Sequence, residues 1–489
     1  MRSFTIALAI ISAGCSTTPA VFEEHLAATA EEERACARWY EALDRAVDEA
    51  RVRDAQYTPV PGFPYLRADR FTASARQRAA TGEGAMRAFA ERLLELDLEA
   101  RGFEIQNLPS WTGSRRMALA RTASCGRALL AADLSRPASR QAMREQARVP
   151  DDYSTTARVL GLYSLTSLVF AGGVRRWEAQ TREAFARPAT GQSTARVRFA
   201  PPAHSVLTRA AVVGMLERAR FDPLGQPIFT EREIDLLAAT FAPSFEITIA
   251  ADYDRFGELR WRRGAATPQV QAAEPAVYVQ RAYTRYGERV LLQLVYTIWF
   301  PERPKNGAFD LLGGRLDGLV WRVTIAPDGE PLLYDSMHSC GCYHQFFPTP
   351  RARLRPAPDP GEEWAFVPAE LPRVAEGERP VVSIESATHY IREVKLVRGI
   401  DSLVRYTMRP YDELRSMMRL EGGMRSMFGS DGLVPGTERA ERFLFWPMGI
   451  ASAGAMRQWG RHATAFVGRR HFDDADLIER RFDIEGLGQ

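Results

Sequence analysis

Hydrophobic positions in the first third of the chain recur at the spacing of amphipathic helices. In "VFEEHLAATAEEERACARWYEALDRAVDEARV", residues 21–52, apolar side chains return every three or four positions and acids stand between them. The segments 84–101, 116–132 and 140–148 repeat this spacing. We therefore expect the N-terminal part of the chain to fold as a bundle of helices.

The most apolar stretch beyond the N-terminal leader is "VLGLYSLTSLVFAGGV", residues 159–174. A helix of this length is shorter than the roughly 20 residues that cross the hydrocarbon core of a bilayer. We therefore expect a buried helix and not a membrane span. The segment that follows, "RPATGQSTARVRFAPPA" at 187–203, has the composition of an exposed linker.

In the second half of the chain the alternation changes to that of strands. "FEITIAADYDRFGELRW" predicts a hairpin with its turn at 256–257, and "AVYVQRAYTRYGERVLLQLVYTIWF" predicts one with its turn at 286–287. "GLVWRVTIAPDGEPLLYDSMH" predicts a third, turning at 328–329, and "RPVVSIESATHYIREVKLV" adds one or two strands. Short helices are expected at 411–419 and 455–467.

Helices first, consecutive antiparallel hairpins next and helices again at the end indicate an α+β fold, not a doubly wound parallel sheet. A chain of 489 residues is long enough for two or three domains. We expect a helical domain with a terminal linker at 15–203. A mainly antiparallel α+β domain, with C-terminal helices, should follow at 204–489.

Composition excludes two classes of protein. Hydrophobic residues make up 45% of the chain, which is too many for a wholly disordered protein. Lys and Arg together number 64 against 61 for Asp and Glu, so no excess of basic residues calls for nucleic acid as a partner.

The first residues, "MRSFTIALAIISAGC", have the features of an export signal: Arg2, a short apolar run over 4–11, and small residues up to Cys15. The segment resembles the lipobox of bacterial lipoproteins, although Ser12 stands where that family usually has Leu or Val. In that family the cysteine becomes the lipidated N-terminus of the mature protein. Ser16 in the next position, in place of Asp, implies sorting to the outer membrane.

This resemblance implies a signal peptide at 1–14 and a palmitate-bearing anchor at Cys15. The protein would then face the periplasm from the outer membrane and have the membrane as a partner. Export also changes what the remaining cysteines are expected to do, because thiols in an oxidising compartment tend to form disulfides or bind metal. Cys36 and Cys125 both lie in helical patterns, so we expect a disulfide between them.

The chemistry in the sequence is concentrated in "MHSCGCYHQFFP", which contains His338, Cys340, Cys342 and His344 in an H-x-C-G-C-x-H pattern. A glycine between the cysteines lets the backbone curl, so that both sulfurs can point to one centre. Thiolate and imidazole are the preferred ligands of zinc and copper. We therefore expect one transition-metal cluster at the end of the third hairpin, approached by His389 from a neighbouring strand.

Two alternatives compete with a metal site. A Cys340–Cys342 disulfide would close a very small ring and could serve in redox chemistry. The segment could also be a structural turn, in a non-catalytic envelope protein that binds a ligand or serves as an assembly scaffold. His462, expected in a helix, and His471, just beyond it, are more often hydrogen-bonded core residues than ligands.

The common catalytic templates are absent from the sequence. It contains no G-x-S-x-G elbow, no H-E-x-x-H, no G-x-x-x-x-G-K-[ST] and no G-x-G-x-x-G that opens a βαβ unit. The sequence therefore names no catalytic residue, and the metal or redox cluster is its main functional hypothesis.

Overall fold

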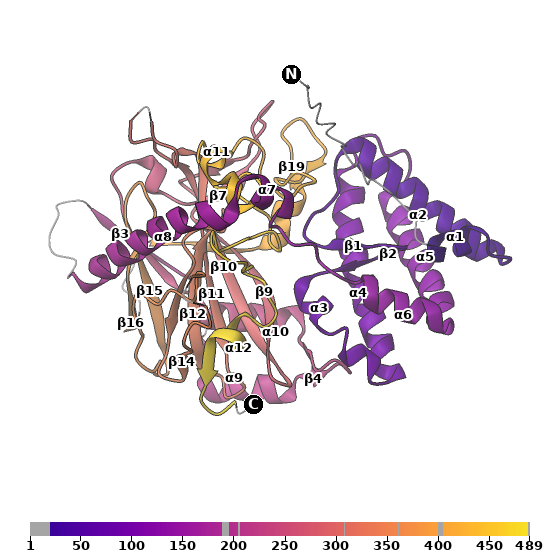
Figure 1. The fold of residues 1–489 in the computed structure, drawn as a ribbon, viewed down its shortest axis with the longest axis horizontal. Coiled ribbons are helices and arrows are strands. Elements are labelled where there is room, and N and C mark those ends of the chain that lie inside the picture. Colours follow the sequence, from indigo (N-terminus) through magenta and orange to yellow (C-terminus); the bar gives the residue numbers. More distant parts are fainter. Residues whose placement is uncertain are drawn as a thin grey trace, which may run out of the picture.

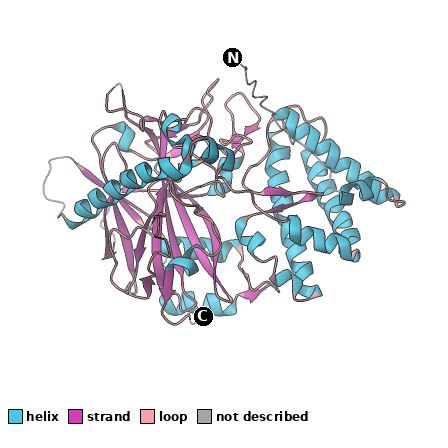
Figure 2. Ribbon diagram, viewed as in Figure 1, coloured by secondary structure: helices cyan, strands magenta, loops and turns pink. Residues whose placement is uncertain are grey.

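The computed structural model describes residues 20–187, 195–203, 206–307, 309–359, 361–399 and 404–487. Helices dominate the first part of the chain and strands the second (Figures 1 and 2), so the expected α+β class is confirmed. The expected signal peptide and Cys15 lie outside the described residues. None of the helices in the described part of the chain is both long and apolar enough to span a bilayer.

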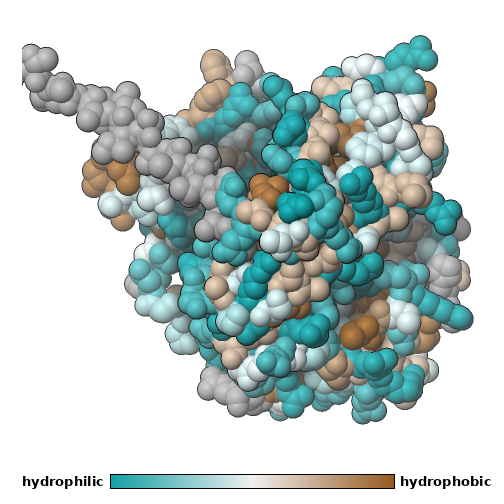
Figure 3. Space-filling model, turned by 90° about the vertical axis from the view of Figure 1, so that its right-hand side faces the viewer, coloured by the Kyte–Doolittle hydropathy of each residue, from teal (hydrophilic) through white to brown (hydrophobic). Residues whose placement is uncertain are grey.

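The N-terminal helices form a body of their own, at the right of Figure 1. Its main helices are α1 (Ala20–Leu26), α2 (Glu31–Ala50), α4 (Glu83–Asn107), α5 (Arg115–Ser135) and α6 (Pro137–Gln146). The smaller elements are β1 (Thr58–Val60), β2 (Phe63–Ala68), α3 (Arg70–Ser74) and η1 (Arg78–Ala80). The outer face of this body is largely hydrophilic, with hydrophobic residues scattered in small groups (Figure 3).

A six-stranded sheet forms the centre of the second body, in the order β13-β12-β11-β10-β9-β18. Its strands are β9 (Ala276–Tyr286), β10 (Arg289–Arg303), β11 (Gly314–Ile325), β12 (Pro331–His338), β13 (Gln345–Pro348) and β18 (Thr407–Pro410). The expected β9–β10 and β11–β12 hairpins are confirmed. β18 joins the sheet parallel to β9, so one pairing is not antiparallel.

A second sheet has the order β16-β15-β6-β3-β17 and shares a hydrophobic core with the first. Its strands are β3 (Arg196–Ala200), β6 (Ser244–Thr248), β15 (Glu378–Ile384), β16 (Ile391–Arg398) and β17 (Val404–Arg405). The helices α9 (Arg209–Arg218) and α10 (Glu231–Phe241) contribute side chains to the same core.

The hairpin expected to turn at 256–257 does not form, so that prediction is wrong. β6 pairs with β3 and β15, whereas β7 (Glu258–Arg260) pairs with β8 (Gln269–Gln271). The reason is burial: Phe245 and Ile247 of β6 are fully buried in the shared core, and they take neighbours from distant parts of the chain. Local alternation alone carries no information about such long-range pairing.

The most apolar stretch forms α7 (Thr155–Leu160) and the start of α8 (Tyr163–Ala186), and the expectation that it is buried is wrong. Its large side chains point outward, and Leu168 is 69% exposed. The inner face of α8 packs instead through Ser167 and Ala171 and through the rings of Phe170, Trp177 and Phe185. The leucines lie on the opposite face of the helix and are therefore left on the outside.

The division of the chain also falls earlier than expected. α7 and α8 lie against the sheet body and not the helical body (Figure 1). β3, which the sequence assigned to a linker, is a strand of the second sheet. The break between the two bodies therefore comes before α7, and not at residue 203.

Short elements complete the sheet body. They are β4 (Arg220–Phe221), β5 (Pro227–Ile228), η2 (Asp252–Asp254), β14 (Ala352–Leu354), η3 (Tyr411–Arg415), β19 (Met417–Met418), β20 (Met424–Arg425), α11 (Arg442–Phe445), η4 (Trp446–Met448), α12 (Leu477–Arg481) and β21 (Phe482–Ile484). The expected helix at 455–467 does not form, and this segment consists of turns. It runs between the sheet and the helical body.

Candidate functional site

The H-x-C-G-C-x-H segment forms a tight turn between β12 and β13. The amide of His338 donates to the carbonyl of Cys342 over 3.0 Å, and the amide of Gly341 donates to the carbonyl of His338 over 2.8 Å. Gly341 has φ +89°, and a Cβ there would collide with the backbone of Ala463. The glycine between the cysteines is thus required by the turn, and it does not by itself indicate a metal site.

The two histidines of this segment lie on opposite faces of the sheet. Ser336 of β12 pairs with Gln345 of β13, so these two side chains share a face. Alternation places His338 on the face of Ser336 and His344 on the other. One metal ion cannot be bound by both side chains, because ligand bonds are only about 2.0–2.3 Å long.

On the sheet face that carries His338, buried histidines lie between buried aspartates. Asp317 of β11 lies 2.8 Å from Nδ1 of His389 and 3.4 Å from Nδ1 of His338. The other ring nitrogen of His389 lies 3.7 Å from a carboxylate oxygen of Asp254 in η2. His389 is in the connection between β15 and β16 with φ +54°, not in a strand as expected. The ring of Phe300 stacks on it at 3.8 Å.

The charges in this arrangement support one another. Burial alone lowers the pKa of His389, but the carboxylates of Asp254 and Asp317 outweigh it and raise that pKa above its ordinary value. Burial raises the pKa of Asp317, yet the two histidines hold it well below its usual range. His389 therefore takes up a proton more readily than an ordinary buried histidine, and it connects both sheets and η2.

On the second face, His344 belongs to a different ion-pair group. Its Nε2 donates to Asp335 over 2.9 Å, and Asp335 also accepts two hydrogen bonds from Arg322, at 2.9 and 2.6 Å. Burial lowers the pKa of His344 to about 3, so the ring is neutral at physiological pH. Burial raises the pKa of Asp335, but Arg322 and His344 overcome this and lower it.

The two cysteines form a third environment. Cys340 and Cys342 are both buried free thiols in a hydrophobic cluster with residues such as Trp299 and Met456. The hydrogen bond to Cys340 and then burial raise the pKa of the Cys342 thiol well above its usual range. A thiol held in its protonated form is a poor nucleophile and a poor metal ligand.

The five expected ligands therefore do not form one cluster in this structure. Within the described residues, no group of three or more His, Cys, Asp or Glu side chains could hold a metal ion. His338 and His389 share Asp317, whereas the thiols and His344 have separate surroundings. Zinc or copper in this segment stays a prediction for metal analysis to test.

The remaining cysteines behave differently. Sγ of Cys36 in α2 lies 2.13 Å from Sγ of Cys125 in α5, so a disulfide joins the two helices. Both residues are buried in the core of the helical body. The linked residues are 89 positions apart in the sequence, and the bond closes a long loop across that body.

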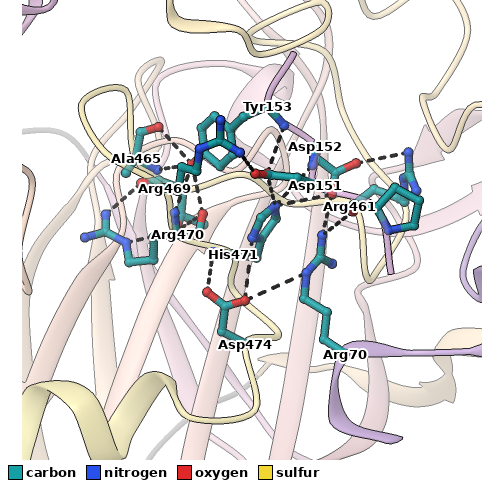
Figure 4. Close-up of polar contacts among 12 residues, drawn as sticks. Arg70, Asp151, Asp152, Tyr153, Arg461, Ala465, Arg469, Arg470, His471 and Asp474 are labelled. Carbon is teal, nitrogen blue, oxygen red and sulfur yellow. Dashed lines mark hydrogen bonds and ion pairs between the residues drawn. The ribbon is translucent and has the colours of Figure 1, made fainter. Parts of the chain in front are cut away.

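His471 lies where the two bodies meet (Figure 4). Its Nε2 is 3.4 Å from Asp151 and 3.6 Å from Asp152, and its Nδ1 is 3.5 Å from Asp474. Arg70 of α3 reaches the same carboxylates, at 2.8 Å from Asp152 and 3.8 Å from Asp474. The group therefore ties α3, the segment before α7 and the C-terminal segment together.

This junction holds His471 in its charged form. Burial lowers its pKa, but the hydrogen bonds to Asp151 and Asp474 outweigh burial and raise the pKa to about 8. His462, by contrast, is buried without a carboxylate beside it, and burial lowers its pKa to about 3. It lies in the turn-rich segment and not in the expected helix.

A cleft of about 440 Å³ opens between the helical body and the six-stranded sheet. α4 contributes Arg92, α10 contributes Asp235, and β9 contributes Gln280 and Tyr283. Nε2 of Gln280 has no hydrogen-bond partner among the described residues. Volumes of roughly 300–1,000 Å³ are typical of small-molecule sites.

Next to the cleft, the buried charges of Arg415 and Asp54 join the two bodies. Arg415 of η3 donates to Asp54 of the helical body over 2.9 Å and pairs with Asp412 at 2.9 Å. It also contacts Glu99 of α4, which accepts from the hydroxyl of Tyr57 over 2.8 Å. This set of contacts fixes the two walls relative to each other.

Sequence reasoning missed the partners of the histidines and all of the cleft. Asp317 and Asp335 carried a usable signal, because each is the one acid of a largely apolar strand and needs a cationic partner when it is buried. The cleft gave none, because its residues come from separate parts of the chain. Comparison with protein-family models, curated proteins and solved structures finds no match for this chain.

Proposed function

We propose that this chain is a non-catalytic cell-envelope protein that binds a small polar ligand in the cleft between its two bodies. The cleft itself is the observation that carries the proposal. Its size suits a small molecule, and its walls come from two bodies held by buried ion pairs. A preformed site of this kind costs little conformational entropy when a ligand binds.

The lining favours a saccharide over an apolar ligand. Tyr57, Tyr283 and Trp459 offer aromatic surfaces, while Asp235, Gln280 and Arg92 offer acceptors and donors for hydroxyl groups. The exposed carboxylate of Asp235 forms no hydrogen bond or ion pair among the described residues, so it is available to a ligand.

The location is a separate part of the proposal. The lipobox-like ending at Cys15 supports an anchored protein that faces the periplasm from the outer membrane. In a variant whose exposed apolar patch, described below, is also substituted, Cys15→Ser should move the protein from the membrane to the soluble fraction when cells are fractionated. Full retention of this combined variant in the membrane would contradict lipidation at Cys15.

The ligand proposal is tested with a probe of defined chemistry. Isothermal titration with a tetramer of N-acetylglucosamine should give a measurable heat with the parent protein. Asp235→Asn should weaken binding about tenfold, which corresponds to about 1.4 kcal/mol. Asp235 is exposed and forms no hydrogen bond or ion pair among the described residues, so this substitution should not disturb stability.

A matched control is Asp252→Asn. The side chain of Asp252 is 97% exposed and lies outside the cleft. It should bind the tetrasaccharide as the parent does. Binding that is absent from the parent at millimolar probe, or equally weakened by both substitutions, would contradict the cleft as a saccharide site.

A further inference from the structure

The surface around α7 and α8 carries large hydrophobic side chains that nothing in the described structure covers. The exposed residues from this segment are Val159, Leu160, Leu162, Leu165, Leu168 and Val169, each 64–77% accessible. Isolated exposed leucines are common, but a contiguous group of this size marks an interaction surface.

A second segment, distant in the sequence, extends the same surface. Phe443, Leu444 and Trp446 of α11 and η4 are also exposed. The two segments are in contact, because the ring centroids of Phe170 and Phe445 lie 5.0 Å apart and Gly161 packs on Pro447. We call these nine exposed residues the apolar patch.

The exposed charges next to the patch are mainly arginines, because the neighbouring acids Glu178 and Glu441 are 21% exposed and buried, respectively. On the outward face of α8, the leucines are followed by Arg175 and Arg176, which are exposed and form no ion pair among the described residues. Arg442 lies beside Phe443 at 4.8 Å. The segments 159–176 and 442–446 contain no Asp or Glu. The patch itself is therefore positively charged, although Arg175 also borders a hollow that contains Glu178, Glu362 and Glu363.

We propose that the apolar patch docks on the surface of an anionic lipid bilayer. Leucine, valine and phenylalanine side chains would enter the boundary of the acyl chains, Trp446 would sit at headgroup level, and the arginines would meet lipid phosphates. The helix lies along the surface and does not cross it, since none of the described helices is fit to span a bilayer.

Charge favours lipid over a second copy of this chain. A self-interface through the patch would bring arginines from both copies together with no carboxylate in either patch to neutralise them. The proposal goes beyond the ligand site and the Cys15 anchor, because it rests on residues 159–176 and 442–446 alone.

The test is vesicle co-sedimentation of the full chain in a Cys15→Ser background, so that any contribution of the N-terminus is the same throughout. Leu165→Glu with Leu168→Glu should lower the partition coefficient for phosphatidylglycerol-containing vesicles at least tenfold. Met418→Glu with Leu420→Glu is the matched control, because these residues are 77% and 70% exposed but lie outside the patch. It should bind as the parent does.

A second variant separates charge from apolar contact. Arg175→Gln with Arg176→Gln should weaken binding to phosphatidylglycerol vesicles severalfold and reduce its dependence on salt, with little effect on pure phosphatidylcholine vesicles. Circular dichroism and thermal unfolding should match the parent, because exposed substitutions rarely affect stability.

Two outcomes would overturn the proposal. One is equal vesicle binding by the parent, the patch variant and the control. The other is a parent dimer, detected by light scattering, that the patch variant converts to a monomer while vesicle binding is unchanged. In that case a second copy of the chain covers the patch. Neither outcome bears on the cleft, whose test uses a soluble saccharide.

Discussion

The charged His471 at the junction of the two bodies makes a quantitative prediction about stability and pH. Its carboxylate neighbours raise its pKa from 6.5 to about 8. A difference of this size corresponds to about 2 kcal/mol, because each tenfold change in proton affinity is worth about 1.4 kcal/mol. The folded state therefore gains about 2 kcal/mol when this ring is protonated.

The sign follows from which state holds the proton more tightly. The contribution of His471 is fully present below the unfolded pKa of 6.5, and it is lost as pH rises through the folded value of about 8. His471→Gln keeps a polar side chain of similar reach but cannot carry the charge. From acid to alkaline conditions, the free energy of unfolding of the parent should therefore fall by about 2 kcal/mol more than that of this variant.

Urea unfolding at about pH 5.5 and pH 9.5, followed by tryptophan fluorescence, measures this difference, since titrations shared by both proteins cancel. His462→Gln is an informative control with the opposite sign. Burial lowers the pKa of His462 to about 3, so its contribution to stability is lost as pH falls below 6.5. Identical pH dependence in the parent and in His471→Gln would refute a buried charge at the junction.

Three further substitutions test separate features of the fold. Asp335→Ala leaves Arg322 buried without its carboxylate and should lower the free energy of unfolding by about 3–5 kcal/mol in urea titration. Gly341→Ala adds a Cβ at φ +89° against a backbone carbonyl and should cost more than about 1 kcal/mol, seen as a lower melting temperature. Replacing Cys36 and Cys125 by serine should cost about 2–5 kcal/mol, and a non-reducing peptide map of the parent should contain the linked pair.

Each of these has an outcome that would contradict it. Asp335→Asn should cost less than the alanine variant, because the amide still accepts a hydrogen bond; an alanine variant as stable as the parent would mean that the pair is solvated. Gly102→Ala, where a Cβ meets nothing within 4 Å, is the control for the glycine variant. Unlinked cysteines in the peptide map would contradict the disulfide directly.

Most helices and hairpins could be predicted from the sequence, because each depends on the hydrophobic spacing within one segment of the chain. The helices α2, α4 and α5 and the hairpins β9–β10 and β11–β12 each follow from a hydrophobic period within one segment. What failed depended on distant residues. β6 takes both of its neighbours from other parts of the chain.

The candidate site failed for a related reason. Clustering of His and Cys in the sequence predicted one metal centre, but the side chains of consecutive strand residues point to opposite faces. Placement of His338 and His344 depended on the register of β12 against β13, which the sequence pattern did not give. The outward leucines of α8 show a similar limit, because apolar composition does not reveal which face of a helix is covered.

The contacts between the two bodies set the order in which this protein can be completed during synthesis. Arg70 pairs with Asp473, Asp54 pairs with Arg415, and Asp151 before α7 pairs with His471. Each early residue therefore has a partner that is synthesised hundreds of positions later. Until then the helical body presents charged groups to water at the surface where it will dock. A polar docking surface lowers the tendency of the growing chain to aggregate, and the junction around His471 forms only when the last part of the chain has been made.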